Sequence, residues 1–359
     1  MRRRQLAVTA VLVLAVLVAG GGVAWWLSHR ATAFEQALGM LPQKSLRVTW
    51  TDWEQVRRLA HGTHLGPGSS RAQLHDFLDR AANRDLDSGS AIDDATYALA
   101  HLFGFSALDA QWEILGQGRQ GQVDLVKVGP GVDMAGIENA LRRLGYQPPA
   151  SGSGTGGTWA GSPDLVARID PSLSPVEQNF VVLPDQGVVM MSDDAAYLSA
   201  AADVLRDGAP SLLSVDGVGD LGHIARAPVN AVLWASTFAC EDLSMGNASA
   251  DDQRVAAALV RKAGGVNPLT GLVMARQASG EIEVGMHFDT AQEAADNLQP
   301  RVDLASGRAP GQGGSFRSRF KVIAAHAQGQ NISMSLAPRR HAFGVLSDIS
   351  QGPVLFATC

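Results

Sequence analysis

The fold is decided by a pattern that is clearest in residues 180–208, which read FVVLPDQGVVMMSDDAAYLSAAADVLRDG. Two short apolar runs flank a turn at residues 184–187, and this spacing predicts a β-hairpin. An apolar stripe with helical spacing follows over residues 197–205, and Asp193 and Asp194 stand where a helix would begin. Their carboxylates can accept hydrogen bonds from the free N–H groups of a first helical turn. The stretch therefore predicts two antiparallel strands and then a helix.

The same strand–turn–strand–helix pattern occurs three more times along the chain. Its hairpins are expected at residues 112–128, 271–288 and 316–336, and an amphipathic helix follows each. Each pair of units comes after one further strand and helix, so the whole arrangement is present twice. We therefore predict an α+β body made of two pseudo-repeated halves, residues 45–225 and 226–359. Each half would be an antiparallel sheet with helices on one face.

The alternation of side chains indicates which strands are open to water. In residues 281–288 and 331–336, apolar and polar residues alternate, as in strands with one solvated face. Residues 180–183, 188–191 and 229–235 are apolar almost throughout, so both faces of these strands should be covered. We expect these apolar strands to lie where the two halves pack together or share a sheet.

The N-terminus carries a candidate membrane anchor. Residues 6–27 hold no charged side chain, and as a helix they would span roughly 33 Å, enough to cross a bilayer. Arginines at residues 2–4 precede this run, so residues 1–30 are predicted to be a single-pass transmembrane signal-anchor with a cytoplasmic tip. Residues 31–44 would be a juxtamembrane linker, with the body outside the cell membrane. A cleavable signal peptide is the alternative, because residues 22–24 fit a cleavage site.

The charge of the chain argues against nucleic-acid partners. The chain has 29 basic and 35 acidic residues, which gives a net charge of −6. Four of the arginines flank the apolar run, at residues 2–4 and 30, so the rest of the chain is more acidic still. An acidic surface repels phosphate backbones and disfavours broad adhesion to anionic lipid.

Cys240 and Cys359 are the two cysteines of the chain, and they are the disulfide candidates. In an oxidising compartment a disulfide between them would hold the C-terminal residue in place. The bond would close a loop of about 120 residues and contribute roughly 4 kcal/mol to the free energy of unfolding. Two unpaired thiols are the alternative.

The chain lacks the familiar catalytic motifs. It has no G-x-S-x-G elbow, no S-x-x-K with its partner motifs, no H-E-x-x-H and no C-x-x-C. We therefore expect no catalytic residue and no cofactor. His61, His64 and His75 are close in sequence, but they do not share one helical face, so solvated histidines are a simpler interpretation than a zinc site.

Residues 83–94 are the nearest match to a metal site. Asn83, Asp85, Asp87 and Asp94 occupy positions 1, 3, 5 and 12 of a calcium-binding loop. The sixth position is a serine where that loop needs glycine, and the twelfth is Asp where the longer Glu is usual. The alternative is a loop whose Asp and Ser side chains cap helices and form turns. These four residues are the metal candidates, and no metal site is expected.

The anchor and the sequence LPxxxLRVTWTDW over residues 41–53 resemble uncharacterised membrane-anchored envelope proteins of actinobacteria. The resemblance implies a location in the cell envelope and no activity. With the lack of catalytic motifs, it favours a non-catalytic extracytoplasmic binding or scaffold protein whose partner is another envelope protein. Two alternatives stay open: a carrier or sensor that binds an apolar, lipid-like ligand between sheet and helices, and an unrecognised envelope hydrolase.

Overall fold

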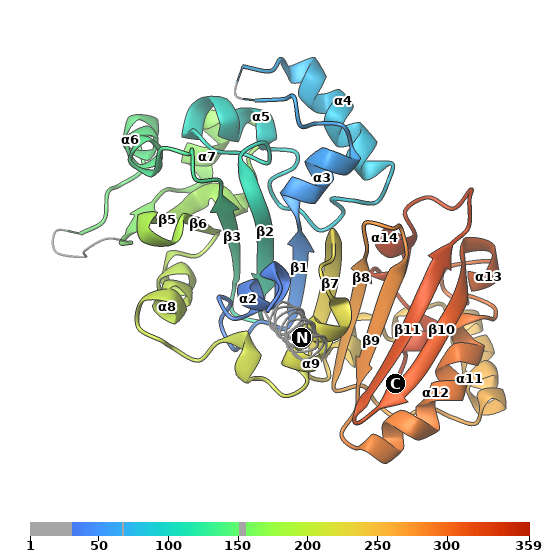
Figure 1. Ribbon diagram of the computed structural model, residues 1–359. Helices are drawn as coiled ribbons and strands as arrows, with labels where there is room; N and C mark the ends of the chain where they lie inside the picture. The colour runs from blue at the N-terminus through green and yellow to red at the C-terminus, as the bar shows by residue number, and fades with distance from the viewer. Residues whose placement is uncertain (1–30, 67, 151–155) are drawn as a thin grey trace, which may run out of the picture.

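The computed structural model describes residues 31–66, 68–150 and 156–359. In these residues the strands form one antiparallel sheet of eleven strands, in the order β10-β11-β9-β8-β7-β1-β2-β3-β6-β5-β4 (Figure 1). The strands are β1 (Arg47–Thr51), β2 (Ala110–Gln117), β3 (Gln122–Val128), β4 (Thr158–Ala160), β5 (Asn179–Leu183), β6 (Val188–Ser192), β7 (Asn230–Ala235), β8 (Gly271–Arg276), β9 (Ile282–His287), β10 (Phe320–Gln328) and β11 (Asn331–Pro338).

Helices lie between these strands and pack on the sheet. The α-helices are α2 (Ala33–Leu38), α3 (Trp53–Leu59), α4 (Arg71–Ala82), α5 (Thr96–Ala98), α6 (Met134–Leu144), α7 (Pro163–Ile169), α8 (Ala195–Arg206), α9 (Val218–Ala225), α10 (Phe238–Asp242), α11 (Ala250–Ala263), α12 (Ala291–Ala305), α13 (Phe316–Arg319) and α14 (Val345–Ile349). A π-helix, η1 (Leu99–Phe103), extends α5, and the 3-10 helices are η2 (Pro175–Gln178), η3 (Pro184–Gln186), η4 (Leu212–Ser214), η5 (Met245–Asn247) and η6 (Leu355–Ala357).

The expectation of a separate sheet in each half is wrong, because the two halves share one sheet. Strand β1 pairs with β7 from Arg47↔Trp234 to Thr51↔Asn230, and it pairs with β2 on its other side. Both β1 and β7 are buried along almost their whole length. Free edges there would leave buried N–H and C=O groups without partners, so the two strands pair with each other.

Helices cover both faces of the first half, and not one face as expected. On one face, α2, α8 and α9 pack with Trp50, Leu125 and Leu233 in a core that spans the centre of the sheet. On the other face, α3, α4 and α6 pack over β3, β5 and β6. The same face of the sheet continues into the second half, where α10, α11, α12 and α14 form a separate core over β7 to β11. We call the face with the two separate cores face 1.

A polar strip separates the two cores of face 1. The β1–β2, β1–β7 and β2–β3 registers place its members on neighbouring strands of one face, and the loop at residues 83–95 lies over it. Gly89 of that loop comes so close that a Cβ there would meet the Thr49 Cβ at 2.8 Å, and Thr49 Oγ1 donates to the Gly89 carbonyl at 2.5 Å. The polar strip consists of Arg47, Thr49, Thr51, Glu113, Gln117, Asp124 and Asn230.

The apolar strands are covered on both faces, but only one of them lies at the junction. Strand β7 is central and fully buried, as expected. Strands β5 and β6 lie near the far edge, with only the short β4 outside them, so their expected position is wrong. Phe180 packs into one core and Val181 into the other, because α8 covers one face there and α6 and η1 cover the other.

Most local features follow the sequence pattern, and two do not. Asp194 caps α8 by accepting from the Tyr197 N–H, as expected. Thr51 and Glu54 have the spacing of a capping box, which would place the cap of α3 at Thr51. The cap is instead Asp52, whose side chain accepts from the Gln55 N–H.

Proline commonly ends a helix, so the sequence predicts that the helix after β9 stops at Pro300. Helix α12 instead runs through Pro300 to Ala305. Proline has no N–H, so one hydrogen bond of the helix is missing at Pro300. The backbone carbonyl that would have accepted it lies on an exposed turn, where water can solvate it.

The expected transmembrane segment, residues 6–27, lies outside the described residues. None of the helices in residues 31–66, 68–150 and 156–359 has the length and apolar character needed to cross a bilayer.

Candidate functional site

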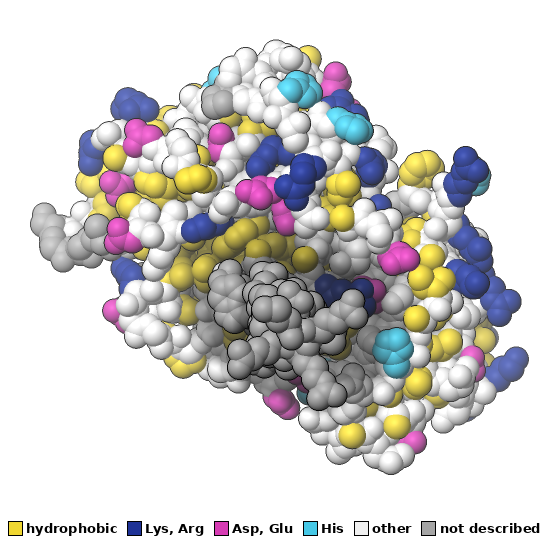
Figure 2. Space-filling view, viewed as in Figure 1, with side chains coloured by type: hydrophobic (Ala, Val, Ile, Leu, Met, Phe, Trp, Pro, Cys, Tyr) yellow, Lys and Arg dark blue, Asp and Glu magenta, His cyan; other side chains and the backbone are white. Residues whose placement is uncertain are grey.

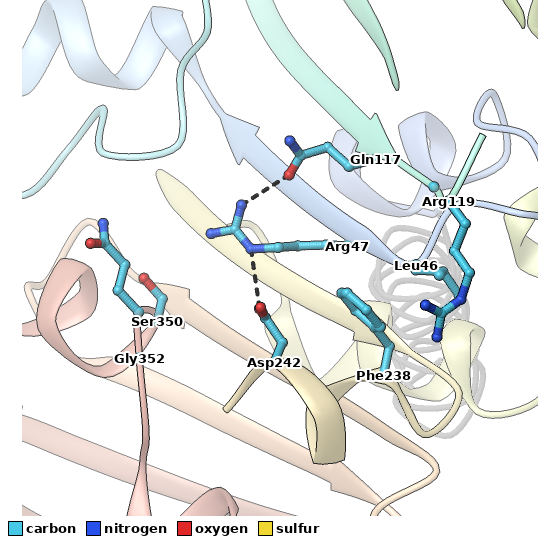
Figure 3. A pocket seen from close by; sticks show the side chains of 10 residues that line it. Leu46, Arg47, Gln117, Arg119, Phe238, Asp242, Ser350 and Gly352 are labelled. Carbon is cyan, nitrogen blue, oxygen red and sulfur yellow. Dashed lines mark hydrogen bonds and ion pairs between the residues drawn. The ribbon is translucent and has the colours of Figure 1, made fainter. Parts of the chain in front are cut away.

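A cleft opens between the two halves at the end of the sheet where β1 begins and β2 ends. It encloses about 520 Å³ and is lined from both halves (Figure 3). The lining residues are Leu46, Arg47, Gln117, Gly118 and Arg119 from the first half, and Phe238, Asp242, Ser350, Gln351 and Gly352 from the second.

Arg47 is the central polar residue of this cleft. As the first residue of β1, it is paired in register with Gln117 on one side and with Trp234 on the other, so its side chain reaches both halves. Its Nη1 donates to Gln117 Oε1 at 3.1 Å, and its guanidinium carbon lies 5.9 Å from the centre of the Trp234 ring. Burial, the larger effect, lowers the pKa of Arg47, and the Asp242 carboxylate opposes that shift.

Asp242 faces Arg47 from the second half. Its Oδ2 accepts a 2.6 Å hydrogen bond from Trp234 Nε1 and lies 3.7 Å from Arg47 Nε. The ion pair is therefore long, since a good charge-assisted hydrogen bond is about 2.8 Å. The side chain of Arg47 keeps 25% of its exposure, and Figure 3 shows it lying between Gln117 and Asp242. Donors of this guanidinium are left over to meet a ligand.

A second bridge between the halves lies at the mouth of the cleft. Arg119, in the β2–β3 turn, donates from Nη2 to both carboxylate oxygens of Glu241, at 2.9 and 2.7 Å. Both side chains are more than half exposed. An exposed pair of this kind contributes at most about 1 kcal/mol, so a ligand can displace it at little cost.

The cleft continues around the β2–β3 turn into a smaller cavity of about 320 Å³. The two cavities share Leu46, Gly118 and Arg119, and the smaller one adds Lys44, Gln120 and Tyr197. Three cationic side chains therefore stand along one groove of an acidic chain. The described lining contains no histidine and no cysteine.

The four metal candidates do not converge on one point. The Asp85 carboxylate accepts from the N–H groups of Leu346 (2.6 Å) and Ser347 (3.2 Å), and so caps α14 of the other half. Asp87 is buried, whereas Asn83 and Asp94 are exposed. Among the residues that the structure describes, no group of three or more His, Cys, Asp or Glu side chains is placed to hold a metal ion.

Buried carboxyl groups of the polar strip are a feature that the sequence reasoning missed. Glu113 accepts from Trp53 Nε1 at 2.8 Å and from Ser90 Oγ at 2.7 Å, and burial raises its pKa to about 7. Neither carboxylate oxygen of Asp124 has a hydrogen-bond partner in the described part of the chain. Burial, and then the nearby Glu113 and Glu177, raise the pKa of Asp124 well above its ordinary value. The sequence does contain a sign of these buried acids, because both stand in strands whose other residues on this face are mainly apolar.

Cys240 and Cys359 form a disulfide, with their Cα atoms 5.4 Å apart and 119 positions apart in sequence. The bond ties the C-terminus to α10, whose Phe238 and Asp242 line the cleft.

Replacing both cysteines with serine is expected to lower the free energy of unfolding by about 4 kcal/mol, because the unfolded chain regains the freedom of a long loop. Urea unfolding of the wild type and the double variant measures the difference. The matched check is a count of free thiols in the unfolded wild type. Two free thiols in protein purified from an oxidising compartment would contradict the expectation.

Comparisons with known proteins do not identify a function for the cleft, so its function is inferred from its own residues. No protein-family model and no curated protein matches the chain. A solved structure titled "Structure of crystal form I of TP0453" is similar to it with a TM-score of 0.36 and 8% sequence identity, over 87% of this chain and 96% of that chain. A likeness at that level supports no inference about fold or function.

Proposed function

We propose that this chain is a non-catalytic binding protein of the cell envelope, anchored by residues 6–27 with its body outside the membrane. We propose further that the cleft between the halves binds a ligand through a carboxylate, such as the C-terminal end of a polypeptide. The observation that carries this proposal is the half-buried guanidinium of Arg47, which both halves contact and whose remaining donors face the cleft.

The geometry favours a carboxylate because of the shape of the guanidinium. Arginine presents its N–H groups as a planar fork that matches the two oxygens of a carboxylate. Gln117 and Asp242 hold that fork from two sides, so little freedom is lost when a ligand binds. Gln351 and Ser350 line the opposite wall and offer polar contacts to a peptide amide.

The apolar, lipid-like alternative has less support from the described cavities. Only Leu46 and Phe238 give the cleft large apolar side chains, and the space between sheet and helices is filled by three packed cores. A polypeptide partner agrees better with a groove that carries Lys44, Arg47 and Arg119.

The test uses tri-alanine with a free C-terminal carboxylate and the same peptide with a C-terminal amide. In titrations into the millimolar range, followed by calorimetry, the free peptide is expected to bind about tenfold or more tightly than the amide. Arg47→Met should remove that preference, because it keeps the length of the side chain and loses its charge.

Arg254→Met is the matched control, since Arg254 pairs with Asp251 on the exposed surface of α11. It should bind both peptides as the wild type does. Equal affinity for the two peptides, or an unchanged preference in Arg47→Met, would overturn the proposal.

A further inference from the structure

A second hollow lies at the opposite end of the sheet from the cleft. Arg47 pairs in register with Trp234 at one end of β7, whereas Arg276 pairs with Asn230 at the other end. The hollow encloses about 380 Å³ between residues 83–85 of the first half and residues 276–281 and 337–345 of the second.

Three guanidinium groups from these three segments line the hollow: Arg84, Arg276 and Arg339. Each is held by a backbone carbonyl: Arg84 donates to Leu59, Arg276 Nη1 to Gly280 at 3.3 Å, and Arg339 Nε to Arg317 at 3.1 Å. Within the described ranges, none of the three forms an ion pair with a carboxylate.

The acids nearby do not neutralise these arginines by direct pairing. The carboxylate of Asp85 is occupied by the N–H groups at the start of α14. Arg276 is partly buried, and its Nε has no hydrogen-bond partner among the described residues. Burial is the largest effect on the pKa of Arg276 and lowers it, nearby Asp85 opposes that shift, and Arg84 adds a smaller lowering. Glu281 lines the hollow as well, so three arginines stand beside two carboxylates and the lining keeps an excess of positive charge that an anion can neutralise.

One prominent aromatic side chain lines the hollow, and cationic side chains lie on the strands that neighbour it. Figure 2 shows lysine and arginine side chains gathered at the right-hand edge of the view, where β10 and β11 lie. Phe343, which lines the hollow, is 75% exposed. Beside the arginines of the hollow, the exposed ring of Phe343 offers an apolar contact to the organic part of a ligand.

We propose that this hollow binds the phosphate group of a ligand, held by Arg84, Arg276 and Arg339, with Phe343 packing against the organic part of the ligand. A phosphate offers three acceptor oxygens and up to two negative charges, which suits a hollow lined by three guanidinium groups better than a carboxylate does. Because Arg84 comes from the first half and the other two from the second, the bound phosphate would also join the halves.

The probes are inorganic phosphate and phenyl phosphate, titrated into the full chain and followed by calorimetry. Both should bind in the millimolar range or tighter, with phenyl phosphate the tighter of the two. The exposed pair Arg84→Gln and Arg339→Gln, made together, should weaken both by about tenfold or more. Phe343→Ala should lower the affinity for phenyl phosphate to that for inorganic phosphate.

Arg261→Gln, on the exposed side of α11, is the matched control and should change neither affinity. Arg47→Met should also change neither affinity. A failure of this proposal can therefore be distinguished from a failure of the carboxylate proposal for the cleft. Cosedimentation with phosphatidylglycerol vesicles distinguishes a lipid headgroup from a soluble ester as the source of the phosphate. No binding of any of these probes, or binding that survives the double variant, would overturn the proposal.

Discussion

Replacing Arg301 with leucine is expected to lower the free energy of unfolding by about 4 kcal/mol, because two buried carbonyls and one partly buried carbonyl lose their donor at once. Arg301 lies on α12 and is fully buried. Its Nη1 donates to the carbonyls of Phe356 (3.0 Å) and Thr358, and its Nη2 donates to that of Asn267 at 2.6 Å. The side chain thus holds the C-terminal segment, next to the disulfide, on the second half.

Urea unfolding measures this loss. Arg261→Leu is the matched control, since Arg261 is an exposed arginine on the neighbouring α11, and it should change the free energy of unfolding by less than about 0.5 kcal/mol. A loss below about 1 kcal/mol for Arg301→Leu would show that the C-terminal segment does not depend on this arginine.

Stability is expected to fall as the pH rises from about 4 to about 8, by 3 kcal/mol or more. In the folded protein, burial raises the pKa of Glu113 to about 7 and that of Asp124 well above its ordinary value. In the unfolded chain both acids ionise near pH 4. Through this window the folded state holds more protons than the unfolded state, so the free energy of unfolding decreases with rising pH. Glu113 alone accounts for about 3 kcal/mol.

Thermal unfolding at about pH 5 and about pH 8 checks this dependence. Asp124→Asn should raise the melting temperature at the higher pH and reduce the difference between the two, because asparagine does not titrate and the cost of keeping this buried acid protonated at the higher pH is removed. Asp185→Asn, an exposed acid of the 3-10 helix η3, is the control and should leave both temperatures unchanged. A melting temperature that rises with pH, or an unchanged slope in Asp124→Asn, would contradict the assignment.

The elements of the fold could be predicted from the sequence because they depend on local periodicity. Residues 188–192 form a strand and residues 195–206 a helix for reasons contained in those residues: apolar spacing, a turn and a capping Asp194. The pairing of β1 with β7 could not be predicted in this way. It depends on which strand edges are buried, and no pattern within Arg47–Thr51 records that.

The difference between local pattern and long-range contact also explains why the candidate site could not be predicted from the sequence. Arg47 stands in its strand as an ordinary polar residue, and its role depends on Gln117 and Asp242, which are distant in sequence. Asp85 was expected to serve its own loop as a metal ligand or cap, but its partners lie 261 and 262 residues away. The roles of Arg47 and Asp85 depend on contacts between the two halves. The sequence shows the type of each residue but does not show these contacts.

The cleft itself is tested most directly by the indole N–H signal of Trp234 in a proton–nitrogen correlation spectrum. Trp234 Nε1 donates to Asp242, the residue that faces Arg47, so a carboxylate that binds Arg47 must change its surroundings. On addition of tri-alanine with a free carboxylate, this signal should shift progressively to saturation, and the amidated peptide should leave it in place. A Trp234 signal that stays still with both peptides, or moves equally with both, would contradict the account.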